Sequence, residues 1–317
     1  MQQVFEHLYS NGALLVLWGA LLFHLVLPIP ASSHPTVLWR AFAKIITDKV
    51  NVNSHYSQSL ISGTLSWMLM MIPAFAVLVA LKPLVWQPQL FDLALLLLAL
   101  DWRNNEKLGH QLTDALAKQD KALARRLLDP ILNRKTSSLS ALGLGKAGAE
   151  TIILGYGRNV VCIVFWYGLT GGIGALLFRF MSELARAWSP TRAEFLPFGL
   201  PAIRLLAVFE FIPLRLFSFI IILGKNIHKI FPLVRSQSKT WSSPGPAWLL
   251  SAVGNKLELS LGGPAIYNDK KTVRVKLGGR IAPSAFHIGQ IQKLLAWRLY
   301  VWIVIQSIVM FLFYQGL

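Results

Sequence analysis

The sequence predicts an all-α, polytopic helical membrane protein that forms one integral domain over residues 1–317. Three observations support this fold class. Hydrophobic residues make up 54% of the chain, and the mean hydropathy is +0.52. Only 14% of the residues are charged, whereas typical soluble domains have about 25%. Apolar stretches of nearly membrane length alternate with basic polar stretches.

The charge balance indicates a membrane surface as the partner. The formal net charge is +17, from 31 Lys and Arg against 14 Asp and Glu. Such an excess suits loops that face an anionic leaflet, and the apolar spans argue against nucleic acid as a partner. The single cysteine, Cys162, excludes an intramolecular disulfide. The first 39 residues contain no Lys or Arg, so the basic region of a cleavable signal peptide is missing.

About six spans are predicted from the apolar runs. Their bounds are about 13–30, 60–84, 86–100, 156–180, 200–224 and 299–315. The third is short: it is either a span joined to the second by a tight hairpin near Lys82-Pro83, or a half-inserted interfacial helix. His24 lies in the first span without an evident partner. Clustered glycines in the fourth let helices approach closely; they are Gly168, Gly171, Gly172 and Gly174.

Three polar regions are predicted to be cytoplasmic. Regions 31–59, 101–150 and 225–298 carry three, nine and twelve Lys and Arg, while the segment before the first span carries none and 179–199 carries three. Six alternating spans place the three basic regions on one side, and the positive-inside rule makes that side cytoplasmic. The expectation is a multi-pass protein of the bacterial inner membrane, with an outer segment at about 181–199 and both termini periplasmic.

Region 101–150 is soluble in character. Leucines recur in it at helical spacing, at positions Leu112, Leu116, Leu123 and Leu127. This pattern predicts an amphipathic helix, and Asp129-Pro130 is expected to end it.

Charged residues at membrane depth are candidates for function. The block 200–224 contains Arg204, Glu210 and Arg215, whose spacings of six and five do not favour pairing on one regular helix. Pro213 can interrupt the helix and open a site. Either a polar cavity is reached from the cytoplasm or the segment is interfacial and its charges snorkel. Glu150 begins the preceding span, where a helix N-terminus alone would also favour a carboxylate.

A polar stretch, Ser243 to Gly279, separates two apolar blocks and is rich in glycine and basic residues. The run Ser243-Pro244-Gly245-Pro246 is expected to form turns that leave backbone N–H groups free, and Gly262-Gly263-Pro264 is a second turn signal. Such loops can cradle an anion such as phosphate. An ordinary surface loop would show the same composition.

A series of short segments runs in order along most of the chain: His34-Pro35, Asp120, Ala124-Arg125, Leu128, Asn133 to Thr136, Ala147 with Glu150, Phe165-Trp166, Gly171 to Arg179, Arg204, Ile212 to Arg215, Ser243-Pro244, Trp248, Leu261 to Pro264 and Tyr267. In their order and spacing these segments resemble the motifs of the CobD/CbiB family of cobalamin-biosynthesis membrane proteins. The chain departs from the family where carboxylates are expected: Leu154, Gly155, Arg158, Leu206 and Ala207 stand in acidic or amide segments, and Gly245 replaces an asparagine.

The resemblance implies a membrane ligase that joins adenosylcobyric acid to aminopropanol phosphate, with ATP and Mg²⁺ as cofactors. It implies Glu150 and Glu210 as candidate catalytic carboxylates, and no metal ligands can be named. Candidate substrate-binding residues follow from the matched segments: His34, Arg134, Arg204, Arg215, Ser243, Trp248, Gly262, Gly263 and Tyr267. Lys256 is a further candidate for a phosphate.

Two other functions are alternatives, one of which the sequence does not favour. Since many carboxylates are absent, the chain could keep the fold without catalysis, as in the AmpE-like relatives of the family, which are proposed to sense or signal at the membrane. A transporter would show an internal repeat, and none is evident. We favour the ligase because the glycine–proline segments are retained. Its expected partners are a corrinoid substrate, aminopropanol phosphate, the lipid bilayer and other membrane enzymes of cobalamin assembly.

Overall fold

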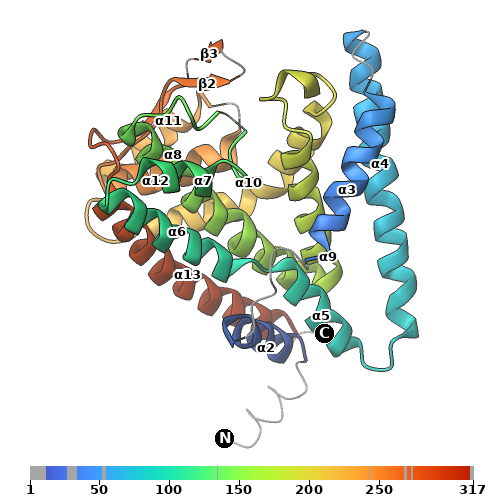
Figure 1. Cartoon of the computed structure of the whole chain (residues 1–317). Coiled ribbons are helices and arrows are strands. Elements are labelled where there is room, and N and C mark those ends of the chain that lie inside the picture. The colour runs from blue at the N-terminus through green and yellow to red at the C-terminus, as the bar shows by residue number, and fades with distance from the viewer. Residues whose placement is uncertain are drawn as a thin grey trace, which may run out of the picture.

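The computed structural model describes residues 12–26, 34–51, 55–133, 135–241, 243–267, 270–272 and 274–314, which are almost entirely helical (Figure 1). The all-α fold class is therefore confirmed. The helices are α2 (Gly12–Val26), α3 (Thr36–Val50), α4 (Tyr56–Leu81), α5 (Pro88–Ala99), α6 (Trp102–Ala117), α7 (Lys121–Leu128), α8 (Ala141–Tyr156), α9 (Cys162–Ala187), α10 (Leu200–Ile222), α11 (Ile227–Ser238), α12 (Pro244–Lys256) and α13 (Ala285–Tyr314). Shorter elements are η1 (Lys82–Leu84), η2 (Gly157–Val161), η3 (Ala193–Phe195), β1 (Ser260–Gly262), β2 (Ala265–Tyr267), β3 (Lys270–Thr272) and β4 (Lys276–Gly278).

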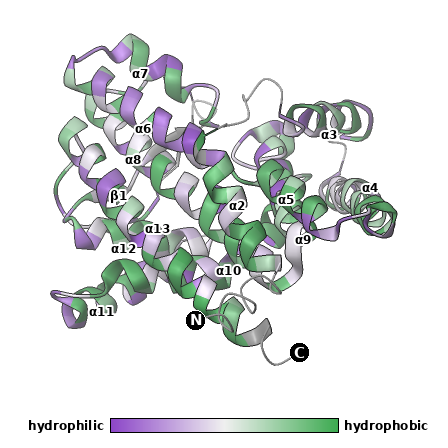
Figure 2. Cartoon of the chain, turned by 90° about the horizontal axis from the view of Figure 1, so that it is seen from below, coloured by the Kyte–Doolittle hydropathy of each residue, from purple (hydrophilic) through white to green (hydrophobic). Residues whose placement is uncertain are grey.

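Long apolar helices make this a membrane protein. Four helical stretches within the described residues are long and apolar enough to cross a bilayer: Tyr56–Leu84, Ala141–Ala187, Leu200–Ile222 and Ala285–Leu312. The helices α2 and α5 have 15 and 12 residues, fewer than the roughly 20 that a bilayer core requires. Figure 2 shows hydrophobic residues along α2, α4 and α5 and hydrophilic residues gathered over α6 and α7. The count of six spans stays a prediction.

Helix α4 presents a continuous apolar face outward. Ile61, Leu65, Leu69 and Ile72 are each 58–62% exposed, and their spacing of three or four residues puts them on one side of a helix. Water would penalise such a surface, whereas lipid tails would cover it at no cost. The turn predicted near Lys82-Pro83 is the 3₁₀ turn η1, after which α5 begins at Pro88.

The chain reverses direction at Gly171, inside α9. Gly171 has φ 70° and ψ −164°, a conformation open to glycine and not to residues with a Cβ. Asn159 and Arg179 are 20 residues apart, which would be about 30 Å along a straight helix. Nevertheless Nη1 of Arg179 donates to Oδ1 of Asn159 at 2.7 Å. The predicted span 156–180 is therefore not one straight helix but two helical segments that pack side by side.

The reversal returns the stretch after α9 to the end of the molecule where α3 and α4 meet (Figure 1). Arg186 Nη2 donates to the carbonyl of Pro130 at 2.6 Å, and Asn51 Nδ2 donates to the carbonyl of Glu194 at 2.7 Å. The predicted outer segment at 181–199 is therefore wrong in one respect, because it contacts residues of both 31–59 and 101–150 rather than lying opposite them. The side of the membrane on which this end lies stays a prediction.

Within the polar region 101–150, the stretch from Leu112 to Leu127 lies in two helices, α6 and α7, where one amphipathic helix was predicted. Gln119, between α6 and α7, has a left-handed φ of 56°, which interrupts the helix. Asp120 then caps α7 by accepting from the N–H of Leu123 at 2.9 Å, as an N-cap aspartate does. The predicted end at Asp129-Pro130 is confirmed, since α7 ends at Leu128.

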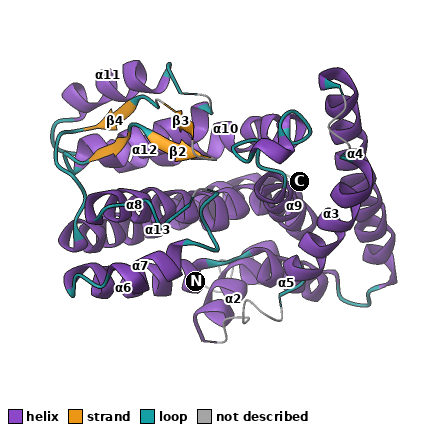
Figure 3. Cartoon of the chain, turned by 45° about the horizontal axis from the view of Figure 1, so that its top comes forward, coloured by secondary structure: helices purple, strands orange, loops and turns teal. Residues whose placement is uncertain are grey.

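Region 225–298 is mostly ordered structure rather than loop. It contains α11, α12, four short strands and the start of α13, which begins at Ala285 instead of the predicted 299. Strand β1 pairs with β4 and β2 pairs with β3, both antiparallel, and Figure 3 shows them gathered with α11 and α12 at one side of the bundle. Gln237 Oε1 joins these parts by accepting from Ser251 Oγ (2.7 Å), Asn255 Nδ2 (3.0 Å) and the N–H of Gly278 (2.8 Å).

Candidate functional site

Glu210 lies in the middle of α10 and is almost completely buried, at 1% exposure. Arg158 holds it with two hydrogen bonds, from Nε to Oε2 at 2.7 Å and from Nη2 to Oε1 at 3.1 Å. Ser243 Oγ also donates to Oε1, at 3.3 Å. The carboxylate is therefore paired and hydrogen-bonded, which a buried charge at this depth requires. Helix α10 continues through Pro213, so the predicted interruption there is wrong.

Arg158 reaches Glu210 because it lies in the π-helical segment η2, Gly157–Val161. A π segment adds a residue to the turn and changes which side chains face a neighbour, and it occurs often at functional sites. Here two adjacent residues of η2 contact different helices. Arg158 pairs with α10, while Asn159 accepts from Arg179 on the returning half of α9.

Glu150 forms a second buried carboxylate site within α8, with 8% exposure. Its Oε1 accepts from the N–H of Gly262 at 2.8 Å, and its Oε2 pairs with Nη2 of Arg274 at 3.3 Å. Arg274 Nε also donates to the carbonyl of Gly263 at 3.2 Å. Glu150 thus anchors the β1 end of the polar region to the helical bundle.

One short segment connects the two carboxylate sites. The ring of Trp241 lies against the guanidinium of Arg274, 5.3 Å from its centroid, and Ser243 contacts Glu210. Trp241 therefore lies beside the Glu150 site and Ser243 beside the Glu210 site. The two candidate catalytic residues lie on different helices, α8 and α10, and each is held by a different arginine.

The glycine and proline segments do not form the N–H cradle that the sequence suggested. Gly262 and Gly263 have φ of 65° and 83°, but the N–H of Gly262 is bonded to Glu150 and that of Gly263 to the carbonyl of Val275. Ser243 stands at the N-cap of α12, and Pro244 and Pro246 in its first turn have no N–H. The N–H groups of Gly262 and Gly263 are therefore engaged within the chain, and the nearby cationic side chains are the groups to consider for an anion.

Arg215 is the cation best placed for that role. Its guanidinium lies 3.8 Å from the ring centroid of Phe211 and 4.9 Å from that of Trp248, and Trp248 packs in turn against Phe231. Its Nε is buried without a hydrogen-bond partner in the described part of the chain. A guanidinium held on aromatic rings without a carboxylate partner is suited to bind a ligand anion.

The other candidate residues are scattered. Arg204 is exposed near the start of α10, and Tyr267 lies in β2, where only its backbone is described. Arg134 lies outside the described residues. Lys256 Nζ donates to the carbonyls of Ile222, Leu223 and Lys225, so it caps the end of α10. Burial, together with nearby Arg298, lowers the pKa of Lys256.

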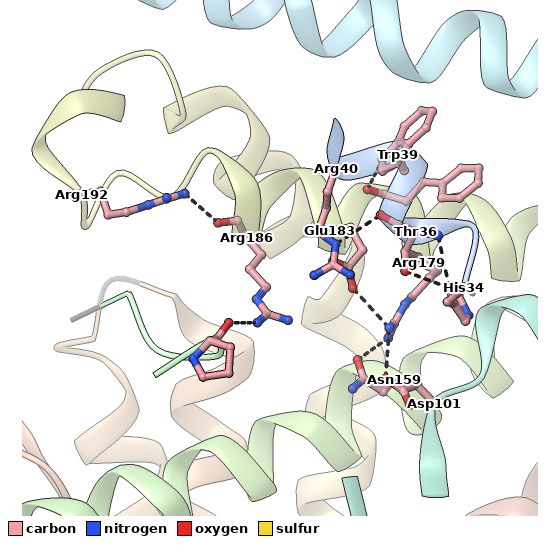
Figure 4. A network of polar contacts seen from close by, with 12 residues as sticks. His34, Thr36, Trp39, Arg40, Asp101, Asn159, Arg179, Glu183, Arg186 and Arg192 are labelled. Atoms are coloured by element: carbon pink, nitrogen blue, oxygen red, sulfur yellow. Dashed lines mark hydrogen bonds and ion pairs between the residues drawn. The ribbon is translucent and has the colours of Figure 1, made fainter. Parts of the chain in front are cut away.

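His34 belongs to a different polar network, around Arg179 on the returning half of α9 (Figure 4). Arg179 is 6% exposed and its Nη2 contacts Asp101 at 3.1 Å and Glu183 at 3.2 Å. Arg40 Nε lies 3.7 Å from the same Glu183. His34 is buried beside them, and burial, reinforced by the charge of Arg179, lowers the pKa of its imidazole.

Sequence reasoning missed this network, and it missed the partner of His24. Arg179 was recognised only as the end of a matched motif, since nothing local shows that Asp101 and Asn159 lie beside it. His24 was judged to have no partner, but its Nε2 accepts from the N–H groups of Trp102 and Arg103 at 3.0 and 3.3 Å. It therefore caps the start of α6 from another helix, which satisfies two otherwise unpaired N–H groups.

The residues present do not fit a magnesium ion held by the protein. Magnesium prefers oxygen ligands, including one or two carboxylates. Within the described residues no group of three or more His, Cys, Asp and Glu gathers as potential metal ligands. Glu150 and Glu210 are also each neutralised by an arginine, which removes the negative charge that a cation would need.

The sequence is similar to proteins of one known family. A family model described as CobD/Cbib protein matches residues 17–296. The protein "Cobalamin biosynthesis protein CobD" of Stutzerimonas stutzeri is 30% identical over 279 residues, covering 85% of this chain and 89% of the relative. Proteins of the same name from Chromobacterium violaceum (30%, 66% of this chain and 67% of the relative) and Leptospira interrogans (25%, 94% and 96%) are also similar. No solved structure matches.

Proposed function

The chain belongs to the CobD/CbiB family, and on that premise we propose that it acts in cobalamin biosynthesis as an adenosylcobinamide-phosphate synthase-like ligase. The reaction joins a carboxyl group of adenosylcobyric acid to the amine of aminopropanol phosphate through an amide bond. The relatives that it resembles most broadly carry names from cobalamin biosynthesis, which disfavours the alternative of a sensor without catalysis.

One observation supports this function above the others. Arg215 presents a half-buried guanidinium on two aromatic rings, without a carboxylate partner in the described residues, and Trp248 of the same group follows the Ser243 that binds Glu210. A large planar ligand with anionic side chains would find aromatic rings and a cation at one place. We propose that the corrinoid binds here and that Arg215 holds one of its anionic groups.

The two glutamates act, in this proposal, by holding the site in shape. Arg158 neutralises Glu210 and Arg274 contacts Glu150, so neither is a free base. Glu210 instead fixes the start of α12 through Ser243, and Glu150 fixes β1 through Gly262. Both are therefore positioning residues, and the side chains that touch substrate are Arg215 and Trp248.

A carboxylic acid must be activated before an amine can attack it, and we propose ATP as the activating reagent. The positive charge that phosphates require is supplied at this end of the bundle by lysines near Gly263, namely Lys146 and Lys276. Because the carboxylates do not fit a protein-held Mg²⁺, no step is assigned to a metal.

We propose that the chain lies in the bacterial inner membrane with its basic end in the cytoplasm. The start of α2 and the last part of α13 lie near the Gly171 reversal: Tyr167 Oη donates to the carbonyl of Ala13, and Gln306 and Met310 lie against Gly168. This supports both termini lying on the periplasmic side, away from the basic segments. Reporter fusions at each terminus and within 225–241 would test the orientation. Other membrane enzymes of cobalamin assembly are proposed as neighbours.

The decisive experiment is complementation of a bacterial strain that lacks the synthase, grown on cobyric acid. We expect growth with the native chain and with Lys229→Gln, which changes an exposed lysine on α11. We expect Arg215→Gln to fail while the protein still reaches the membrane, and its corrinoid affinity to fall at least tenfold, about 1.4 kcal/mol. A native chain that is present at normal levels without supporting growth, and that forms no amide when purified, would overturn the proposal.

A further inference from the structure

Helix α10 presents an apolar stripe to the outside of the molecule. Its members recur every three or four residues, so they share one face of the helix. They are Val208, Ile212, Leu216 and Phe219, and each is 45–68% exposed. Because α10 is long and apolar enough to cross a bilayer, lipid chains can cover this stripe, which water would penalise.

The stripe ends where the chain turns from α10 into α11. Gly224 and Asn226 make this turn with φ of 99° and 67°, and α11 begins only five residues after α10 ends. Lys256 Nζ and Arg298 Nη2 both donate to the carbonyl of Leu223, at 3.1 and 2.9 Å. Since cations near the end of a span lie at the bilayer surface, α11 lies at about the depth of the lipid headgroups.

A hollow of about 220 Å³ opens on α11 at this corner. It is lined by Phe231, Pro232, Arg235, Ser236 and Lys239. The last four follow the spacing of one helix face, and α11 lies at the outer edge of the molecule in Figures 2 and 3. The ring of Phe231 also packs against that of Phe219, with centroids 6.4 Å apart. The hollow is therefore continuous with the apolar stripe of α10.

The hollow combines two cations with apolar side chains. Among the described residues that line it, Arg235 and Lys239 are charged and none is acidic. Neither of these two side chains has a hydrogen-bond or ion-pair partner in the described part of the chain. The volume is below the roughly 300–1,000 Å³ of a typical small-molecule pocket. This corner therefore suits the charged end of an amphiphilic anion whose apolar part lies outside the hollow.

We propose that this corner binds one anionic phospholipid. Its phosphate contacts Arg235 and Lys239, and an acyl chain lies along the stripe of α10. A headgroup with a net negative charge, such as that of phosphatidylglycerol, complements two cations without a carboxylate. A zwitterionic headgroup brings a cation of its own toward them. The ring of Phe231 also packs on Trp248, so the lipid borders the proposed corrinoid site without using Arg215.

The test measures lipid binding to the purified full chain in a non-ionic detergent, by isothermal titration calorimetry. The probes are short-chain phosphatidylglycerol, phosphatidylcholine with the same chains, glycerol phosphate and inorganic phosphate. We expect one phosphatidylglycerol to bind, at least about tenfold more tightly than phosphatidylcholine. The two phosphates without chains should bind more weakly, because they bury no apolar surface. Equal affinity for the two lipids, or a chainless phosphate that binds as tightly as phosphatidylglycerol, would overturn the proposal.

Two double variants distinguish a site from general attraction by a basic surface. Arg235→Gln/Lys239→Gln should weaken phosphatidylglycerol binding at least about tenfold and leave phosphatidylcholine binding unchanged. Lys225→Gln/Lys229→Gln is the matched control, because it removes the same charge from exposed positions that do not line the hollow. It should bind phosphatidylglycerol as the native chain does. All four side chains are exposed, so folding should be retained. Equal weakening by the two double variants would show general attraction alone and would refute a defined site.

Discussion

Replacing Glu210 by glutamine should destabilise the protein strongly. Glutamine is nearly the same size as glutamate, and its side-chain oxygen can still accept from Ser243. The change therefore removes the negative charge and leaves the shape. What remains is the guanidinium of Arg158, whose Nε loses its 2.7 Å contact with Oε2 and meets an amide NH₂ group there instead. Its uncompensated charge is the source of the expected effect.

The size of the effect follows from the burial of the pair. Breaking a buried ion pair by removing one partner costs about 3–5 kcal/mol. The Glu210 side chain is 1% exposed but that of Arg158 is 28% exposed, so partial hydration of Arg158 favours the lower end. A loss of about 3 kcal/mol should lower the melting temperature by roughly 6–12 °C for a chain of this order of size.

The assay is thermal unfolding of detergent-purified protein, followed by loss of the folded peak in size-exclusion chromatography. The double variant Arg158→Met/Glu210→Leu completes the comparison, because an apolar pair of similar volume can replace a buried ion pair with little loss. We expect it to recover most of the stability lost by Glu210→Gln. A melting temperature for Glu210→Gln within about 2 °C of the native value, or a double variant no better than the single one, would refute this account of the pair.

Three other changes should have measurable effects. Gly262→Ala would place a Cβ against the carbonyl of Val275 at a φ of 65°, and it should cost at least about 1–2 kcal/mol, which is the left-handed penalty alone. Gly289→Ala, where the added Cβ meets nothing within 4 Å, should instead gain up to about 1 kcal/mol of helix propensity. Equal melting temperatures for the two variants would contradict this account. Arg179→Gln should lower the melting temperature as Glu210→Gln does, because Asp101 and Glu183 lose their shared cation, whereas Arg103→Gln breaks an exposed pair worth under about 1 kcal/mol. The pKa of His34 is lowered in the folded state by burial and Arg179, with Asp101 and Glu183 acting in the opposite direction, so stability should be full above the unfolded pKa of about 6.5 and decline as pH falls below it. Between about pH 5 and 7.5, the melting temperature should change less with pH for His34→Gln than for the native chain. Identical slopes would show that His34 does not titrate in this way.

Composition and motif order predicted the class of protein, but they could not predict its pairings. Hydrophobic periodicity reports which face of a helix is buried, not what lies against it. Partners for Glu210 were sought at Arg204 and Arg215 on the same helix, and the true partner, Arg158, is 52 residues away. The partners of His24 and Arg179 were missed for the same reason, because their contacts join distant parts of the chain.

The fourth predicted span illustrates a second limit. Glycines between Gly168 and Gly174 were taken to allow close helix packing, and Gly172 does pack against Asp92, whose Oδ1 accepts from its N–H at 3.1 Å. The reversal at Gly171 was not predicted, since a glycine with positive φ and a glycine in a regular helix have the same sequence signal. The alternation of six spans depended on that segment crossing in one direction, so the location of 181–199 was predicted wrongly.

The π segment has a consequence for how this protein can vary. Each residue of a regular helix turns the chain by about 100°, so deleting one residue between Gly157 and Val161 would restore ordinary helical turns and rotate everything before it by that angle. The side chain of Glu150 would then rotate away from the N–H of Gly262, while α9 kept its contacts. Arg158 and Asn159 could no longer face opposite sides. We therefore expect the length of this stretch to be fixed among working homologues, even where its residues differ, and single-residue gaps to be tolerated in the turn after α7 instead.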